Sequence, residues 1–162
     1  MTTTATVAKA IGLLGSAWLS GNISAYTLVS LPSILVSVRE NNVPISNALH
    51  IWRHTYEAGR AQNPFVALVS AGALAISAWK TGEMGFWIAA VATLGIVPYT
   101  VVVMTRTLER LVQLARQAEK EELGVKDMYE AEKLLGWWVV LNGIRSLFPL
   151  LGAVSAAATV LF

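Results

Sequence analysis

The last apolar segment of the chain, Leu134–Phe162, carries the side chains that are best suited to chemistry. Asn142 and Arg145 lie three residues apart in it, so a helix places both on one face. The same face continues at helical spacing through Trp138, Pro149 and Gly152. A charged side chain inside an apolar span is costly to keep, and its presence favours a functional site. Both polar residues are hydrogen-bond donors, so this face could stabilise a negatively charged substrate oxygen.

Both polar residues also have a purely structural interpretation. Arg145 can pair with Glu57, or donate to a backbone carbonyl, and thereby hold the helices together. Asn142 can donate a hydrogen bond between helices. The neighbouring face of the segment is entirely apolar and is expected to meet lipid or packed helices: Trp137, Leu141, Ile144 and Phe148.

A second polar face lies in residues 46–59, where His50, His54 and Glu57 follow one another at intervals of four and three residues. Each of them could act as a catalytic base. The same spacing is typical of a metal site, so a transition metal at these three residues is the alternative. Because the sequence offers no further strong ligand and no cysteine, we expect catalysis without a metal. The structural interpretation places both histidines on a solvated face at the membrane interface.

Aromatic side chains lie close to both polar faces in the sequence and could line a flat apolar cavity for a substrate. Aromatic residues of membrane proteins also gather in interfacial belts, which remains the alternative for each. The candidates for substrate binding are Trp138, Tyr56, Tyr99, Trp52, Trp18 and Tyr26.

The composition is that of an integral membrane protein. Hydrophobic residues make up 55% of the 162 residues and charged residues 14%, with a mean hydropathy of +0.57, whereas soluble domains carry about 25% charged residues. The apolar runs are continuous rather than alternating, which favours helices over a β-barrel. The lack of cysteine excludes thiolate chemistry, and a net charge of +2 is too small to indicate nucleic-acid binding. We predict a single all-α domain over residues 1–162, a transmembrane four-helix bundle.

The hydropathy pattern predicts four spans, over residues 10–38, 65–79, 85–104 and 134–162. An amphipathic interfacial helix is expected between the first two spans, with Ser46 as its N-cap and Gly59 as its C-cap. Asn63-Pro64 is expected to open the second span, because proline is favoured in the first turn of a helix. Pro98 lacks a backbone N–H and is expected to kink the third span.

Positive charge is distributed unevenly between the two sides of these spans. Nine of the twelve basic residues lie in the two loops that join spans one to two and three to four. By the positive-inside rule these loops are cytoplasmic, so both termini are expected on the non-cytosolic side.

Three sets of residues resemble motifs of the small four-helix membrane family that includes the fungal anthrone oxygenases of aromatic polyketide pathways. The first set is Trp52, Tyr56, Gly59 and Pro64. The second is Pro98-Tyr99-Thr100 with Met104 and Thr107. The third, which is the most specific, is Trp138, Leu141-Asn142, Arg145, Pro149-Leu150 and Gly152. The chain has Leu108 where the family often has asparagine, and otherwise the resemblance spans nearly the whole chain.

The resemblance implies that an anthrone is oxidised to an anthraquinone with molecular oxygen. Deprotonation of the anthrone methylene gives a carbanion delocalised onto the ketone, and such an anion can reduce oxygen without a flavin or a metal. Arg145 and Asn142 would then hold the oxyanion, and His54, His50 or Glu57 would act as the base.

A second hypothesis is a non-catalytic small membrane protein that binds or carries an apolar metabolite, with the same polar face used for binding only. A metal-dependent oxidase at His50, His54 and Glu57 is a third. The expected partners are a small aromatic polyketide, oxygen and membrane lipid, and an oligomer is possible. The expected location is the endoplasmic reticulum or another intracellular membrane.

The charge asymmetry yields a test of topology. Cysteines introduced singly near Ala5 and near Gln117 are expected to react with a membrane-impermeant reagent from opposite sides of sealed vesicles, because these positions flank opposite ends of the spans. Labelling of both positions from the same side would contradict the predicted topology.

Overall fold

The computed structural model describes residues 3–162, and within this range the chain forms helices joined by short turns. Residues 1 and 2 of the predicted domain lie outside the described residues. The helical segments are, in order, α1 (Thr3–Ala25), η1 (Tyr26–Ser30), α2 (Leu31–Glu40), α3 (Ile45–Thr81), α4 (Met84–Leu94), α5 (Ile96–Tyr99), η2 (Thr100–Met104), α6 (Thr105–Ala118) and α7 (Val125–Leu161). Here η1 and η2 are π-helical segments, in which one extra residue widens the helical turn.

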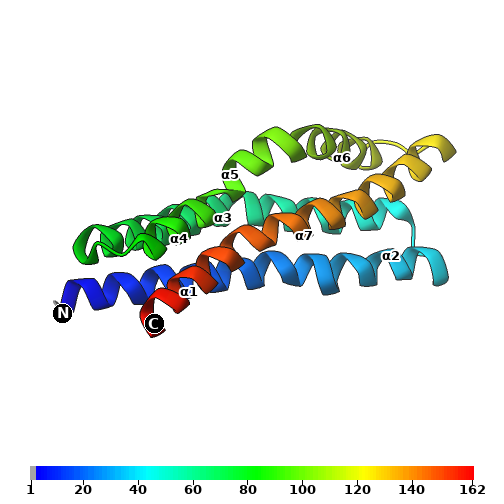
Figure 1. The fold of residues 1–162 in the computed structure, drawn as a ribbon. Coiled ribbons are helices and arrows are strands. Elements are labelled where there is room, and N and C mark those ends of the chain that lie inside the picture. The colour runs from blue at the N-terminus through cyan, green and yellow to red at the C-terminus, as the bar shows by residue number, and fades with distance from the viewer. Residues whose placement is uncertain (1–2) are drawn as a thin grey trace.

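These segments join into four long rods that pack as a bundle (Figure 1). Each rod is long and apolar enough to cross a membrane, as predicted: Thr3–Glu40, Ile45–Thr81, Met84–Ala118 and Val125–Leu161. In the bundle α1 packs against α3 and α7, and α4 packs against the same two helices. The N- and C-termini lie at the same end (Figure 1).

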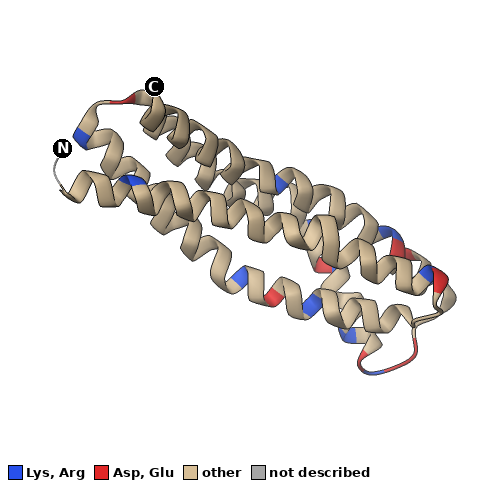
Figure 2. Ribbon diagram, turned by 90° about the horizontal axis from the view of Figure 1, so that it is seen from below, with Lys and Arg blue, Asp and Glu red and all other residues tan. Residues whose placement is uncertain are grey.

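Most charged residues lie toward the end of the bundle away from the termini (Figure 2). Ion pairs at that end join the helices to one another. Arg39 pairs with Glu132, Arg53 of α3 pairs with Glu119 next to α6, and Arg110 of α6 pairs with Glu130 of α7. The charge asymmetry of the sequence is therefore also an asymmetry of the folded molecule.

The second rod differs from the predicted one. A separate interfacial helix ending at Gly59 was expected, but α3 runs without a break through Gly59 and Pro64. Its N-cap is Pro44 rather than Ser46, and the left-handed residue that ends it is Gly82, with φ of 77°. A proline inside a membrane helix is tolerated where neighbouring helices support the backbone, and α3 packs against α1, α4, α6 and α7.

The third rod bends where Pro98 predicts a kink, and the irregularity is longer than one turn. The helix is interrupted at Gly95 and passes through α5 and η2 before α6 begins at Thr105. The hydroxyl of Thr105 donates to the backbone oxygen of Val101 at 2.7 Å, and that of Thr100 to Ile96 at 2.6 Å. Such side-chain bonds to the preceding turn bend helices. Consequently α6 leaves the line of α4 (Figure 1).

Candidate active site

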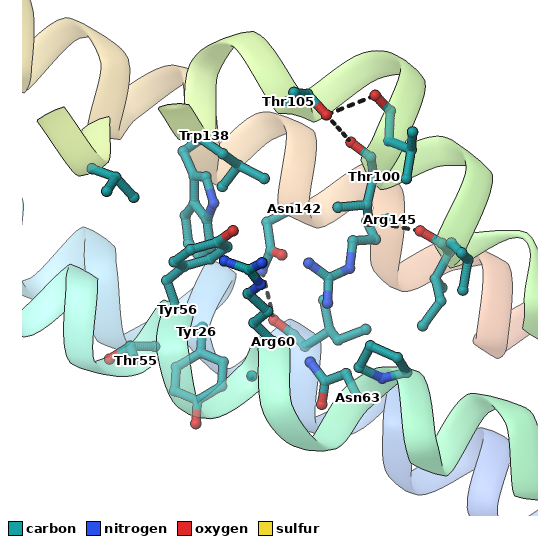
Figure 3. Close-up of a pocket in the computed structure, with 18 of the residues that line it drawn as sticks. Tyr26, Thr55, Tyr56, Arg60, Asn63, Thr100, Thr105, Trp138, Asn142 and Arg145 are labelled. Atoms are coloured by element: carbon teal, nitrogen blue, oxygen red, sulfur yellow. Dashed lines mark hydrogen bonds between the residues drawn. The ribbon is translucent and has the colours of Figure 1, made fainter. Parts of the chain in front are cut away.

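A cavity of about 450 Å³ lies between these irregular segments, in the size range of small-molecule sites. Its walls come from α1 and η1, from the middle of α3, from α5, η2 and α6, and from α7 (Figure 3). The lining residues are Ile23, Tyr26, Thr55, Tyr56, Gly59, Arg60, Asn63, Pro64, Ile96, Val97, Thr100, Val101, Thr105, Leu108, Glu109, Val112, Trp138, Asn142 and Arg145.

The face of α7 that the sequence singled out forms one wall of this cavity. Trp138, Asn142 and Arg145 all line it, and Pro149 and Gly152 continue the buried face beyond it. The neighbouring apolar face lies partly on the surface and partly in the core. Trp137 and Ile144 are exposed on the bundle surface, while Leu141 is buried in the core. The helical spacing therefore predicted correctly which side of α7 turns inward.

Arg145 has no carboxylate partner. Within residues 3–162 it forms no ion pair, and its buried Nε atom has no hydrogen-bond partner. Glu57, the partner considered from the sequence, pairs with Arg53 at 2.8 Å instead. Because buried charges are normally paired, an unpaired guanidinium on a cavity wall is available to an anionic or carbonyl ligand.

Asn142 is engaged differently from the donor role expected of it. Its Nδ2 group donates to the Thr27 hydroxyl at 2.9 Å and to the backbone oxygen of Ile23 at 3.2 Å. An amide has two N–H donors, so neither is left for a substrate oxyanion. The two bonds attach α7 to the start of η1, which also places Tyr26 in the cavity wall. Asn142 is thus a positioning residue for the widened turn.

Aromatic rings of α3 and α7 form a packed trio beside Arg145. Tyr56 stacks on Trp52 with ring centroids 5.3 Å apart and planes 2° apart, and Trp52 meets Trp138 edge to face at 6.1 Å. Tyr56 and Trp138 line the cavity, whereas Trp52 is fully buried behind them. The trio gives the cavity a rigid aromatic wall, which suits a planar aromatic ligand.

Besides Trp52, two further aromatic candidates do not line the cavity, Trp18 and Tyr99. Trp18 is 49% exposed on the surface of the bundle. Tyr99 packs against Phe148 at 5.3 Å between ring centroids, and its buried hydroxyl has no partner within the described residues. Trp18 shares a helical face with Asn22 and Tyr26, but the turn widens at η1, so the face does not stay aligned with the cavity.

The three candidate bases, His50, His54 and Glu57, also lie outside the cavity lining. They belong to the first, charged turns of α3, before its apolar part. His54 and Glu57 are exposed, and the Nδ1 atom of His50 lies 3.7 Å from a carboxylate oxygen of Glu119. The hydrogen bond from Arg53 lowers the pKa of the Glu57 carboxyl, which makes it a weaker base. Within residues 3–162 there is no group of three or more histidine, aspartate or glutamate side chains that could hold a metal ion.

The cavity also contains polar residues that the sequence analysis did not select. Arg60 and Asn63 follow Tyr56 at intervals of four and three residues, on the face of α3 that turns inward (Figure 3). Asn63 accepts a hydrogen bond from Asn22 of α1 at 3.0 Å. Reading α3 as one continuous helix would have predicted both. Glu109 of α6 is a further charged residue of the lining, and Leu108, where the chain departs from the family pattern, lies beside it in the cavity wall.

These features define a class of protein: a four-span helical bundle whose spans enclose an aromatic cavity with an unpaired guanidinium. The chain belongs to the anthrone oxygenase family, whose model matches residues 52–155, a range that contains all three motifs. This result confirms the resemblance noted from the sequence.

Individual relatives agree with the family assignment. The anthrone oxygenase encC of Aspergillus fumigatus is 34% identical over 159 residues, which cover 90% of this chain and 88% of that protein. The anthrone oxygenase tpcL of the same species is 30% identical, over 91% of this chain and 89% of the relative. The noranthrone monooxygenase of Aspergillus flavus is 28% identical, over 89% of this chain and 69% of the relative. No solved structure matches the chain.

The hydrogen bonds donated by the Asn142 amide predict how substitutions there change the stability of the folded protein. Asn142→Leu leaves the Thr27 hydroxyl without its donor, and we expect a loss of about 1–3 kcal/mol, measured as a lower melting temperature in detergent. Replacing both partners by apolar residues of similar shape removes the unsatisfied group. The double variant Asn142→Leu with Thr27→Val should therefore be more stable than Asn142→Leu alone. Additive losses in this double-mutant cycle would show that the hydrogen bond does not hold η1 in place.

Proposed function

We propose that this protein is a membrane-bound oxygenase that converts an anthrone-type polyketide to the corresponding anthraquinone with molecular oxygen. The observation that carries the proposal is the unpaired Arg145 guanidinium in a cavity walled by Tyr56 and Trp138. It is supported by membership of the anthrone oxygenase family and by relatives named anthrone oxygenase and noranthrone monooxygenase.

The chemistry of an anthrone accounts for the parts of this site. An anthrone has a doubly benzylic methylene opposite a ketone, and loss of one methylene proton moves an electron pair onto the ketone oxygen. The resulting anion transfers one electron to oxygen, and recombination forms a peroxide at the former methylene carbon. Loss of water from the hydroperoxide gives the second carbonyl. One anthrone and one oxygen molecule thus yield one anthraquinone and one water.

Arg145 is proposed to stabilise the oxyanion formed in the first step. Its donors are not engaged by any carboxylate within residues 3–162, so they can bind the oxygen on which negative charge develops. A donor held in place before the reaction is most effective at this kind of charge development. Tyr56 and Trp138 would hold the planar rings, and Arg60 adds a second positive charge to the same cavity.

The proposal needs no flavin and no metal, because the anthrone anion itself is the reductant of oxygen. Both the substrate and oxygen are apolar enough to partition into membranes, which fits a cavity placed between four apolar rods. By the positive-inside rule we place both termini on the non-cytosolic side, in the endoplasmic reticulum or another intracellular membrane. Contact with lipid and formation of an oligomer belong to the same proposal.

Variants of Arg145 test the proposed role. Arg145→Met removes the guanidinium but keeps length and apolarity, so we expect a protein that melts no lower than the parent. Its oxygen uptake with emodin anthrone should fall on the order of 100-fold, as for other oxyanion donors. Arg145→Lys should restore little, because an ammonium group cannot reproduce the planar pair of donors.

Arg106→Met is the matched control for this series. Arg106 is an exposed arginine of α6 that does not line the cavity, so its loss should leave oxygen uptake close to that of the parent. Full activity of Arg145→Met would refute the oxyanion role. A parent protein that binds the anthrone without consuming oxygen would favour the non-catalytic carrier.

Metal independence has its own test. We expect oxygen uptake to survive dialysis against a chelator, because the cavity lining offers one carboxylate and no histidine. Elemental analysis of the active protein should find no transition metal in stoichiometric amount. A stoichiometric metal that is lost together with activity would contradict this expectation and would make His50, His54 and Glu57 the candidate ligands.

A further inference from the structure

Deprotonation of an anthrone needs a proton acceptor that reaches the methylene carbon. Carboxylates and imidazoles are the usual acceptors near neutral pH. The chain has ten acidic residues and two histidines, all within the described residues, and Glu109 is the one among these twelve that lines the cavity. The cavity lining thus contains one carboxylate, that of Glu109, and two guanidinium groups, those of Arg60 and Arg145.

The backbone of α6 turns Glu109 toward the cavity. Thr105, four residues earlier, and Val112, three residues later, also line it, so these positions form one helical face. The opposite face of α6 is buried in the core through Leu111, Leu114 and Ala115. Glu109 is exposed and also lines the cavity, so its carboxylate lies where the cavity is open to its surroundings.

Ion pairs hold α6 in this position without using Glu109. Arg110, its neighbour, donates to both carboxylate oxygens of Glu130 on α7, at 2.9 and 2.7 Å. Glu119, just after α6, accepts from Arg53 of α3 at 2.7 Å. Glu109 itself forms no ion pair within residues 3–162, so its carboxylate is free to accept a proton.

We propose that Glu109 is the catalytic base, an inference that rests on the proposed function. Its carboxylate takes one methylene proton, the C–H bond breaks, and the electron pair moves to the ketone oxygen beside Arg145. After oxygen has added, protonated Glu109 returns this proton to the peroxide. The carboxylate then removes the second proton from the same carbon while the O–O bond breaks and the new carbonyl forms. The hydroxide that leaves takes this proton from Glu109, which releases water and restores the carboxylate.

The oxyanion donor and the base must lie on two different walls of the cavity. In an anthrone the ketone and the methylene lie on opposite sides of the central ring, so no single side chain can serve both. Arg145 comes from α7 and Glu109 from α6, and the aromatic wall of Tyr56 and Trp138 lies along the same cavity. The arrangement provides a donor, a base and a surface for the rings between them.

The base can be tested without oxygen. Emodin anthrone is incubated with the full-length protein in detergent, in heavy water and under anaerobic conditions, and loss of the methylene proton signal is followed by NMR. Oxidation cannot occur, so only the proton-transfer step is measured. We expect the parent to catalyse exchange above the protein-free background. Exchange by Glu109→Gln should fall on the order of 100-fold, the usual contribution of a general base.

Three further measurements show whether a loss of exchange is specific to the carboxylate of Glu109. Glu109→Asp keeps a carboxylate and should recover part of the exchange. Glu122→Gln, an exposed carboxylate in the turn after α6, is the matched control and should exchange like the parent. Anthrone binding, followed by quenching of tryptophan fluorescence, should change less than about threefold in Glu109→Gln, because a base contributes to the chemical step rather than to uniform binding.

The possible outcomes separate this inference from the proposed function. If Glu109→Gln exchanges like the parent while the parent consumes oxygen, the base assignment is wrong and the oxygenase stands. Loss of exchange in Glu57→Gln but not in Glu109→Gln would likewise overturn the assignment. Loss of anthrone binding in Glu109→Gln would make Glu109 a binding residue and not the base. If the parent neither exchanges protons nor consumes oxygen, the proposed function itself fails.

Discussion

The unpaired guanidinium of Arg145 is the constraint on which the rest of the site depends. A charge inside an apolar bundle is stable only if the protein, water or a ligand compensates it. Glu57 and Glu130 are committed to other arginines, Arg53 and Arg110, and Glu109 of the cavity lining forms no ion pair within residues 3–162. The fold therefore leaves the Arg145 guanidinium of α7 without an ion-pair partner within residues 3–162. Such a donor adds no stability to the protein alone and is understandable as a feature kept for a ligand.

A bundle of four straight helices would fill its interior with side chains and leave no room beside Arg145. Two π-helical segments, η1 and η2, border the cavity and widen the first and third rods there. Wide turns of this kind are frequent at functional sites. The amide of Asn142 holds η1 in place, and threonine hydroxyls support the bend beyond Pro98. The cavity is thus a product of local helix irregularity and not of loose packing.

The ion pairs at one end of the molecule help to shape the cavity. Ion pairs between α3, α6 and α7 lie at one end of the bundle, beyond the apolar spans. Exposed ion pairs contribute little to stability individually, about 0–1 kcal/mol each. Their effect here is geometric, because they fix α6 where it diverges from α4 and so determine which of its faces borders the cavity.

The sequence by itself determined the four spans, the inward face of α7 and the bend near Pro98, because hydropathy, helical spacing and a missing backbone donor act locally. It also placed His50, His54 and Glu57 on one face of a helix, which is a local property. Whether that face meets the cavity depends on how α3 rotates against α1 and α4, and only the tertiary structure decided this. Packing buried Asn63 in the cavity wall, placed the exposed Arg60 in the same lining and left the histidines outside it. The sequence did not predict the place of Glu109 either, because Glu109 is one of several charged residues of an amphipathic helix. Its place in the cavity lining follows from the packing of α6 against α3 and α7, long-range contacts that no local pattern encodes.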